Sequence, residues 1–451
     1  MGGTVPAAAI DAASATVLTG TIGTAAYKIE IPANWNGTLV LYSHGYRSPG
    51  SPNPASDVGD PVTGAWLLGQ GYALAGSSYS STGFALEGVA DQFALLDFFD
   101  AQFGTPRRTI AWGHSLGGLG TALLVERQPE RFAGALPMCG PLAGGLNYWN
   151  AALDSTFVFK TLMAPTSGLQ LVNIQNPTGN VQLAEGILAQ AQASPQGRAR
   201  VALAAAMLDL PGWFDPASPE PAIADVLTRE LNQAQWEARQ DLPFDFGGRA
   251  ELELRAGGNF SWNVGVDYRE QLAHSSNRAE VRALYEQAGL SLSADLEALE
   301  AAPRIEANPA ATAALGKAST LTGFIQVPVL TMHTTGDGLI PVEDERAYAS
   351  FVRAADAEAL LRQTFVHRAG HCTFTPAETI AAFQALVRRL DTGTWADRVQ
   401  PAELDEAAAA LGPSFNVVLT QQGAFPSPPA FIRFVPPQFP RVSDKRRSTI
   451  D

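Results

Sequence analysis

The stretch TIAWGHSLGGLG, Thr109–Gly120, changes character at its centre. Its first half is apolar, as in a buried strand, and its second half is rich in glycine and leads into the helical pattern ALLVER. Ser115 stands between the halves, with Gly113 and Gly117 on either side at a spacing of two. The order strand, G-x-S-x-G, helix predicts a nucleophile elbow, a tight turn that projects a serine hydroxyl above the edge of a sheet.

The glycines and the helix have separate roles in such a turn. Side chains at positions 113 and 117 would collide with neighbouring strands, so glycine is expected at both. The N-terminus of the helix directs free N–H groups at a reacting carbonyl, and the N–H of Leu116 is best placed to stabilise an oxyanion. A G-x-S-x-G string arises often by chance in a chain with 42 glycines. Its place between a strand and a helix favours a catalytic serine.

Strands and helices alternate around this motif. Apolar runs at Gly37–Gly45 and Gly71–Ser80 are followed by a helical pattern at Val89–Gly104, and the rhythm resumes at Val327–Asp337. Strands that alternate with helices predict an α/β fold, in which a mostly parallel central sheet is covered by helices on both faces.

A long, mostly helical segment separates the two α/β parts, and an insertion of that size is interpreted as a cap domain. We expect a first core part at 1–140, a mainly helical cap at 141–320, a second core part at 321–392, and an extended proline-rich segment at 393–451 that packs on the core. The sequence FPSPPAFIRFVPPQFPRV within the last part has too many prolines for a helix or an inner strand.

A serine hydroxyl is a weak nucleophile until a base removes its proton. The chain has six histidines. His371 follows the predicted strand LRQTFVH in a loop, where its side chain is free to face the serine from above the sheet edge. His371 is therefore the expected base, and His367, inside that strand, is the second candidate.

The base needs an acid that holds its tautomer and stabilises the imidazolium. Asp337 is the expected acid because it stands in the turn directly after a predicted strand, in HTTGDGLIPVED. Glu343 and Asp344 are the alternatives, although acids in a first helical turn usually interact with the helix dipole. The order Ser115, Asp337, His371 is that of hydrolases built on a nucleophile elbow.

The motifs GHSLGG, SHGY, GDGLIPV and AGHC together resemble those of the α/β-hydrolase superfamily, particularly its esterase, lipase and prolyl-oligopeptidase-like branches. The resemblance covers roughly 24–140 and 321–390, and excludes the expected cap and tail. It implies an α/β-hydrolase fold in which Ser115 is the nucleophile, His371 the base and Asp337 the orienting acid.

The resemblance also implies a second oxyanion donor in the loop after LVLYSHG. This chain has His44-Gly45-Tyr46-Arg47 there, not the HGGG string of one lipase and esterase group. The expected donor is then the backbone N–H of Tyr46, which acts together with that of Leu116. The Tyr46 ring is a candidate wall for an acyl or aryl group, with simple packing as the alternative.

The chain has two cysteines, Cys139 and Cys372, which are too few for a disulfide scaffold or a zinc ribbon. Cys372 follows His371, and Cys139 ends the strand after the elbow helix, so both are expected at the same sheet edge, where a bridge is permitted. Two buried thiols are the alternative. Some feruloyl esterases and tannases resemble this in bridging beside the catalytic histidine, but there the partner cysteine adjoins the serine.

Composition limits the partners and the location. The net charge of −14 disfavours nucleic acid and anionic membranes as partners, and the basic cluster Asp444–Arg447 is interpreted as a solvated terminus. No apolar run approaches the roughly 20 residues of a membrane span, and the start of the chain has no signal-peptide pattern. A disulfide would favour a secreted or extracytoplasmic protein, while a cytoplasmic location stays open. No metal-ligand spacing or nucleotide fingerprint is present, so no metal or cofactor is expected.

Aromatic residues beside Gly, Pro or Asn suggest an aromatic-lined cleft for acyl or aryl groups. The candidate substrate-binding residues are Tyr46, His114, Trp149, Trp213 and Trp262. For each cap residue among them, packing of the cap on the core is the alternative.

These features together predict a serine hydrolase that cleaves carboxylic esters through an acyl-enzyme, with a small-molecule or polymeric ester as substrate. A peptidase or amidase with the same machinery and an acyltransferase are alternatives, and a binding protein on an inactive hydrolase scaffold is the non-enzymatic one. The sequence does not determine the oligomeric state.

Overall fold

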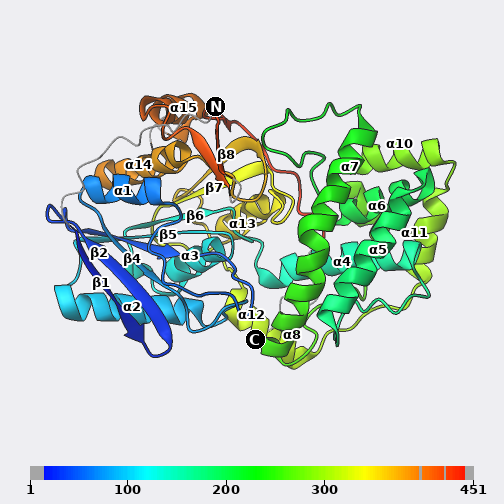
Figure 1. The fold of residues 1–451 in the computed structure, drawn as a ribbon, viewed down its shortest axis with the longest axis horizontal. Coiled ribbons are helices and arrows are strands. Elements are labelled where there is room, and N and C mark those ends of the chain that lie inside the picture. Colours follow the sequence, from blue (N-terminus) through cyan, green and yellow to red (C-terminus); the bar gives the residue numbers. More distant parts are fainter. Residues whose placement is uncertain (1–14, 396–398, 421–422, 442–451) are drawn as a thin grey trace.

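A computed structural model of the chain describes residues 15–395, 399–420 and 423–441. Figure 1 shows two parts next to each other, a core built on a central sheet and a bundle of helices. Two segments that the sequence analysis interpreted lie outside the described residues: the start of the chain at 1–14 and the basic cluster at 444–447.

The central sheet has nine strands in the order β1-β2-β4-β3-β5-β6-β7-β8-β11. All pairs from β4 across to β8 are parallel, and the outer strands β1, β2 and β11 add antiparallel edges. This confirms the predicted mostly parallel sheet. The strands are β1 (Thr16–Ile22), β2 (Ala25–Ile31), β3 (Thr38–Ser43), β4 (Ala73–Ser77), β5 (Arg108–His114), β6 (Gly134–Met138), β7 (Val329–Gly336), β8 (Leu361–Ala369) and β11 (Phe431–Ile432).

Helices cover both faces of the sheet, because successive side chains of a buried strand point to opposite sides. Leu39 and Leu41 of β3 pack in one apolar cluster, and Val40 and Tyr42 pack in another. The first cluster includes α2 (Gly88–Phe103), α3 (Leu116–Arg127) and α13 (Glu343–Ala354). The second includes α1 (Pro61–Gly69), α14 (Pro376–Thr392) and α15 (Pro401–Ala410).

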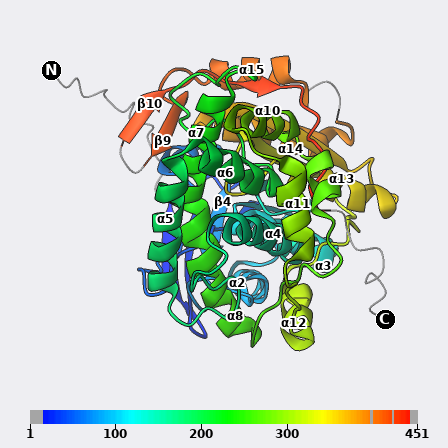
Figure 2. The same cartoon turned by 90° about the vertical axis from the view of Figure 1, so that its right-hand side faces the viewer.

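The helical part, which we call the cap, is inserted between β6 and β7 and has an apolar cluster of its own. Figure 2 shows it from the side that faces away from the sheet. No helix of the described residues is long and apolar enough to cross a membrane. The cap elements are α4 (Gly145–Met163), α5 (Pro177–Gln192), α6 (Pro195–Met207), α7 (Val226–Trp236), the π-helical segments η2 (Glu237–Asp241) and η3 (Pro243–Gly248), α8 (Arg249–Ala256), α9 (Tyr268–His274), α10 (Arg278–Ala288), α11 (Leu292–Ala301) and α12 (Pro309–Ser319).

The sequence predicted an extended segment at 393–451, but the described part of this segment is not extended throughout. Helix α15 forms within it, because Pro401 at the first helical position is followed by a run of strong helix formers. β9 (Val417–Thr420) and β10 (Gly423–Pro426) form a hairpin, and β11 joins the sheet as an edge strand beside β8. Residues 433–441 then continue without helix or strand toward the cap, where Arg441 pairs with the buried Asp154 at 3.2 Å.

Candidate active site

Ser115 occupies the sharp turn between β5 and α3, with φ 59° and ψ −126°. A Cβ built at Gly117 would overlap the carbonyl of Ser43, and one at Gly113 would overlap the carbonyls of Ser43 and Gly117. Neither position therefore accepts a side chain without movement of the backbone. The turn is fixed further by the Ser115 N–H, which donates to the Met138 carbonyl of β6 at 3.0 Å.

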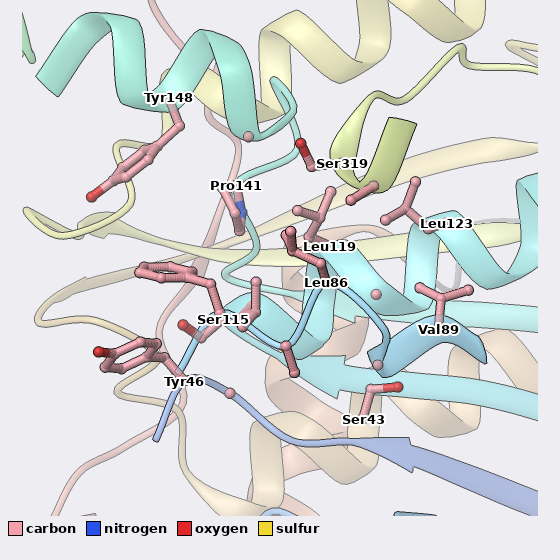
Figure 3. Close-up of a pocket in the computed structure, with 18 of the residues that line it drawn as sticks. Ser43, Tyr46, Leu86, Val89, Ser115, Leu119, Leu123, Pro141, Tyr148 and Ser319 are labelled. Carbon is pink, nitrogen blue, oxygen red and sulfur yellow. The ribbon is translucent and has the colours of Figure 1, made fainter. Parts of the chain in front are cut away.

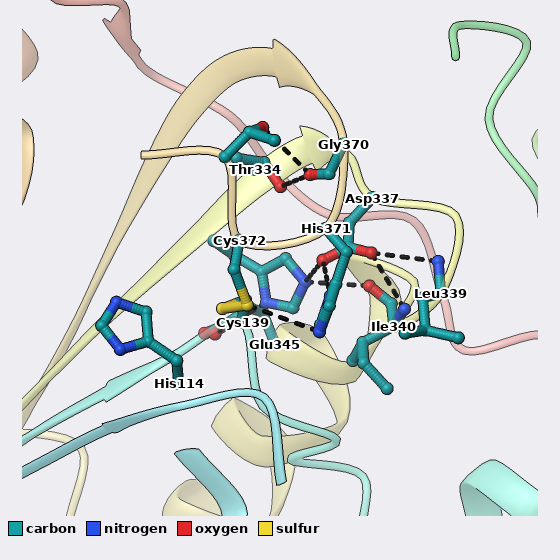
Figure 4. Close-up of a disulfide and its surroundings, with 12 residues drawn as sticks. His114, Cys139, Thr334, Asp337, Leu339, Ile340, Glu345, Gly370, His371 and Cys372 are labelled. Atoms are coloured by element: carbon teal, nitrogen blue, oxygen red, sulfur yellow. Dashed lines mark hydrogen bonds and ion pairs between the residues drawn. A yellow bond between two sulfur atoms is a disulfide. The ribbon is translucent and has the colours of Figure 1, made fainter. Parts of the chain in front are cut away.

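Asp337 and His371 lie in contact above the neighbouring strand ends (Figure 4). Asp337 follows β7 and His371 follows β8, and the distance from His371 Nδ1 to Asp337 Oδ2 is 2.7 Å. The other carboxylate oxygen of Asp337 accepts the N–H groups of Leu339 and Ile340, each at 3.0 Å. The carboxylate is fully enclosed, and it therefore holds the imidazole in one orientation.

A second histidine, His333 of β7, lies behind this pair. Its Nε2 lies 3.6 Å from Asp337 Oδ2 and its Nδ1 lies 3.4 Å from Glu345 Oε1. Burial alone would lower the pKa of His333, but the two nearby carboxylates, Asp337 and Glu345, raise it to about 10. Burial alone would raise the pKa of Asp337, but His371 and His333 together lower it. Asp337 is therefore an anion held between two imidazoles.

The sequence indicates a core position for His333, not a role in the site, because His333 lies within a predicted strand. The spacing of four between His333 and Asp337 is the one signal that pointed to their contact, and it is a weak one outside a helix.

A disulfide joins Cys139, just after β6, to Cys372, with a Cα–Cα distance of 5.5 Å and a sequence separation of 233. Cys372 directly follows His371, and its sulfur lies 3.4 Å from His371 Nε2. The predicted bridge is therefore present, and it fastens the His371 loop to the end of the strand next to β5.

Ser115 and His371 line the same cavity. No hydrogen bond connects the side chains of these two described residues, and His371 contacts Asp337 and Cys372. His371 Nε2 contacts the Cys372 sulfur instead. The loop after β3 passes directly beside the serine, since a Cβ built at Gly45 would lie 3.2 Å from Ser115 Cβ. His367, the second candidate base, is 44% exposed, lies 3.5 Å from Glu220 and does not line this cavity.

The cavity has a volume of about 340 Å³ and two chemically different ends (Figure 3). Ser115 lies between them, with Tyr46 and Tyr148 on one side and Leu119 and Leu123 on the other. The aromatic end also includes Phe84, Trp149 and Phe244, and the aliphatic end includes Val89 of α2 and Leu315 of α12. Among the described residues, no aspartate, glutamate, lysine or arginine lines the cavity.

Core and cap build the aromatic end together. Tyr46 and Phe84 come from loops after β3 and β4, and their ring centroids are 4.7 Å apart. Trp149 of α4 stacks on Phe244 of η3 at 5.3 Å. Between the two parts, Tyr46 meets Phe244 and Phe84 meets Trp149, each with ring centroids 5.3 Å apart, so rings of the cap contact rings of the core in this wall of the cavity. No cluster of three or more potential metal-ligating side chains is present among the described residues.

Known proteins resemble this chain over most of its length. A family model described as the prolyl oligopeptidase family matches residues 70–160, the region that contains the elbow. Among curated proteins, an o-phthalyl amidase of Xanthobacter agilis is 28% identical over 416 residues, which cover 85% of this chain and 89% of that protein. Together with the mostly parallel sheet and the serine elbow, these similarities show that the chain has the α/β-hydrolase fold.

Several solved structures are also similar to this chain. An esterase from Aspergillus oryzae is 15% identical, with a TM-score of 0.41 over 84% of this chain and 79% of that one. Feruloyl esterase B from Aspergillus oryzae is 15% identical, with a TM-score of 0.39 over 84% and 80%. The acylaminoacyl peptidase of Pyrococcus horikoshii is 9% identical, with a TM-score of 0.38 over 85% of this chain and 42% of that one.

Not all of the candidate substrate-binding residues line the cavity. Tyr46 and Trp149 line it, but His114, Trp213 and Trp262 do not. His114 lies behind the elbow, where its Nδ1 is 3.4 Å from the Tyr42 hydroxyl and burial lowers its pKa to about 4. These three predictions were wrong for one physical reason: tertiary packing decides which side of a helix or loop faces the cavity.

The two tryptophans that miss the cavity have other neighbours. Trp213 packs against the ring of His367, with centroids 5.1 Å apart, and Trp262 lies under the guanidinium of Arg441 at 5.5 Å. Phe84, Tyr148 and Phe244 line the cavity, although the sequence analysis did not select them.

Proposed function

We propose that this α/β-hydrolase cleaves carboxylic esters through an acyl-enzyme, with Ser115 as nucleophile, His371 as base and Asp337 as the acid that orients the base. One observation carries the proposal: Ser115 on its elbow and an imidazole held by Asp337 open into a single uncharged cavity. The substrate would be a small-molecule or polymeric ester.

In the acylation step, Ser115 Oγ attacks the carbonyl carbon while His371 Nε2 takes the hydroxyl proton. The imidazolium then carries its charge next to Asp337, and the proton passes to the departing oxygen as the ester bond breaks. Water repeats the sequence on the acyl-enzyme and releases the acid. In this structure Nε2 contacts the Cys372 sulfur, and catalytic hydrogen bonds commonly tighten only in the substrate complex.

The oxyanion would be held by the backbone N–H groups of Leu116 and Tyr46. Neither group donates to another described residue, and Leu116 begins α3, so both donors are available. Removal of one such donor typically costs about 3 kcal/mol of transition-state stabilisation. The cation on His333 supports the same step, because it keeps Asp337 ionised and able to stabilise the imidazolium.

The cavity favours uncharged aryl and alkyl acyl groups. A charged acyl group would lose its hydration there without gaining an ionic partner, which is costly. Aromatic rings at one end and leucines at the other offer contact to a flat ring or to an aliphatic chain. The disulfide beside His371 favours an oxidising, extracytoplasmic location.

Amide hydrolysis is the second candidate, because the curated relative is named as an amidase. The same residues suffice, provided that His371 protonates the departing nitrogen before the bond breaks. An amide leaves less readily than an ester, so the comparison of the two on one acyl group separates the candidates.

The test combines labelling with kinetics. A fluorophosphonate probe is expected to label the wild type and the exposed-serine control Ser350→Ala, and to leave Ser115→Ala unlabelled. The kcat/KM for p-nitrophenyl esters should fall by roughly four to six orders of magnitude in Ser115→Ala. Matched p-nitroanilides with the same acyl group then decide between ester and amide. Folded wild-type protein that is not labelled would overturn the proposal in favour of a binding role.

A further inference from the structure

A second groove of about 410 Å³ lies on the other side of His371. It shares only His371 with the apolar cavity. Gly370 and Thr373 of the core form one wall, and cap residues around positions 214–216 and 235–240 form the other. Its lining combines aromatic and polar side chains and is more polar than that of the first cavity, and it includes an arginine, Arg239.

Arg239 belongs to η2 and is exposed. Its guanidinium lies over the ring of Phe214 at 5.8 Å, and that ring meets Trp236 edge-on with centroids 4.9 Å apart. Trp236 is fully buried and donates through Nε1 to the Trp213 carbonyl at 3.0 Å. The guanidinium therefore rests on a rigid aromatic support, and it forms no ion pair with a carboxylate of the described residues.

Of the described residues that line the groove, Asp215 alone carries a carboxylate, and both of its oxygens accept hydrogen bonds within its own turn. Oδ1 accepts the N–H of Ala217 at 2.9 Å, and Oδ2 accepts the hydroxyl of Ser218 at 2.8 Å. Asp215 forms no ion pair with Arg239, although its negative charge still weakens the attraction of the groove for an anion.

The position of the groove identifies which part of a substrate it would hold. The base must return its proton to the leaving group, so the leaving group lies beside the imidazole. The groove touches His371 but neither Ser115 nor the two expected oxyanion donors. A group in it would therefore lie on the leaving-group side of the scissile bond, with the acyl group in the apolar cavity.

We propose that the groove binds the leaving group and that Arg239 recognises a carboxylate on it. This inference rests on the proposed function and specifies its substrate class: apolar acyl groups joined to an amino acid or to a hydroxy acid. A guanidinium binds a carboxylate through two parallel hydrogen bonds, which neither a hydroxyl nor a carboxamide reproduces.

The experiment compares leaving groups that differ only in charge. Phenylacetyl esters of glycolic and 3-hydroxypropionic acid, and phenylacetyl amides of glycine and β-alanine, are each tested as the free carboxylate and as the primary carboxamide. The measured quantity is the ratio of kcat/KM for the carboxylate to kcat/KM for the carboxamide. The ester pairs and the amide pairs distinguish a hydroxy acid from an amino acid as the leaving group.

Substitutions at two residues should change this ratio in opposite directions. Arg239→Gln is expected to lower it by roughly five- to tenfold, and Arg239→Glu should lower it further. Asp215→Asn should raise the ratio, because it removes the opposing charge. The control Arg278→Gln changes an exposed cap arginine that lines neither cavity and should leave the ratio unchanged. Added salt should weaken the preference in the wild type.

Fluorophosphonate labelling of Ser115 accompanies each measurement and reports an intact site. A ratio that is equal in the wild type, Arg239→Gln and Asp215→Asn, with labelling retained, would overturn the role of Arg239 and leave the proposed function standing. Absence of labelling in the folded wild type would overturn the proposed function, and this inference with it.

Discussion

Asp245 offers a direct test of how the cap depends on pH. It lies on the π-helical segment η3, is 1% exposed, and has no hydrogen-bond partner for either carboxylate oxygen among the described residues. Burial raises the pKa of Asp245 to about 7, although the nearby Arg249 opposes the increase. In the unfolded chain the same carboxyl would titrate near its ordinary value of 3.8.

Because the folded state keeps this proton to a higher pH, the free energy of unfolding falls as pH rises from about 4 to about 7. A shift of about 3 pKa units lowers the free energy of unfolding by about 4 kcal/mol over the whole titration. About 2 kcal/mol of this decrease occurs between pH 5.5 and pH 8. Asp245→Asn keeps the shape and cannot ionise. We therefore expect the variant to be more stable than the wild type at pH 8, and its advantage to shrink by about 2 kcal/mol at pH 5.5.

Thermal unfolding followed by circular dichroism at pH 5.5 and pH 8 measures this difference. Glu286→Gln removes an exposed acid of α10 and serves as the control, with no pH-dependent gain expected. Burial also raises the pKa of Glu237 to about 8, so part of the pH dependence should remain in Asp245→Asn. An equal difference in melting temperature between Asp245→Asn and wild type at both pH values would refute the reasoning.

Two further predictions concern the connections around the site. The double substitution Cys139→Ser, Cys372→Ser should lower both the melting temperature and kcat/KM, because the His371 loop is no longer linked to the end of β6. The loss of stability is at most about 5 kcal/mol in the chain-entropy model. Unchanged esterase kinetics would show that the disulfide does not position the loop. Arg441→Ala should lower the free energy of unfolding by about 3–5 kcal/mol, measured by thermal or denaturant unfolding, because the buried Asp154 loses its ion pair. A decrease below about 1 kcal/mol would show that the C-terminal segment does not stabilise the cap.

The parallel sheet could be predicted because its strands are buried on both faces and appear as continuous apolar runs. LVLYS in β3 and ALAGS in β4 are such runs, and each is fully buried. Strand β1 was missed for the opposite reason. Its sequence TVLTGTI is mostly exposed at the edge of the sheet, and it pairs only with β2 in a hairpin.

The positions of Ser115, Asp337 and His371 could be predicted from local rules, since each follows the end of a predicted parallel strand and such ends meet at one edge of a sheet. The lining of the cavity could not. Trp213 and Phe244 are both aromatic residues in the cap, yet Phe244 faces the cavity and Trp213 packs elsewhere. Helix packing decides between them, and sequence periodicity does not describe it.

The π-helical stretch of the cap has the largest consequence of all the features that the sequence concealed. Arg239 of η2 and Phe244 of η3 are five residues apart, which in a regular α-helix would point them about 140° away from each other. Hydrogen bonds from i to i+5 bring residues at this spacing closer to one face. Phe244 thereby lines the cavity of Ser115 and Arg239 lines the groove beside His371. One π-helical stretch thus supplies a residue to the cavity and a residue to the groove, so it borders both sides of the proposed scissile bond.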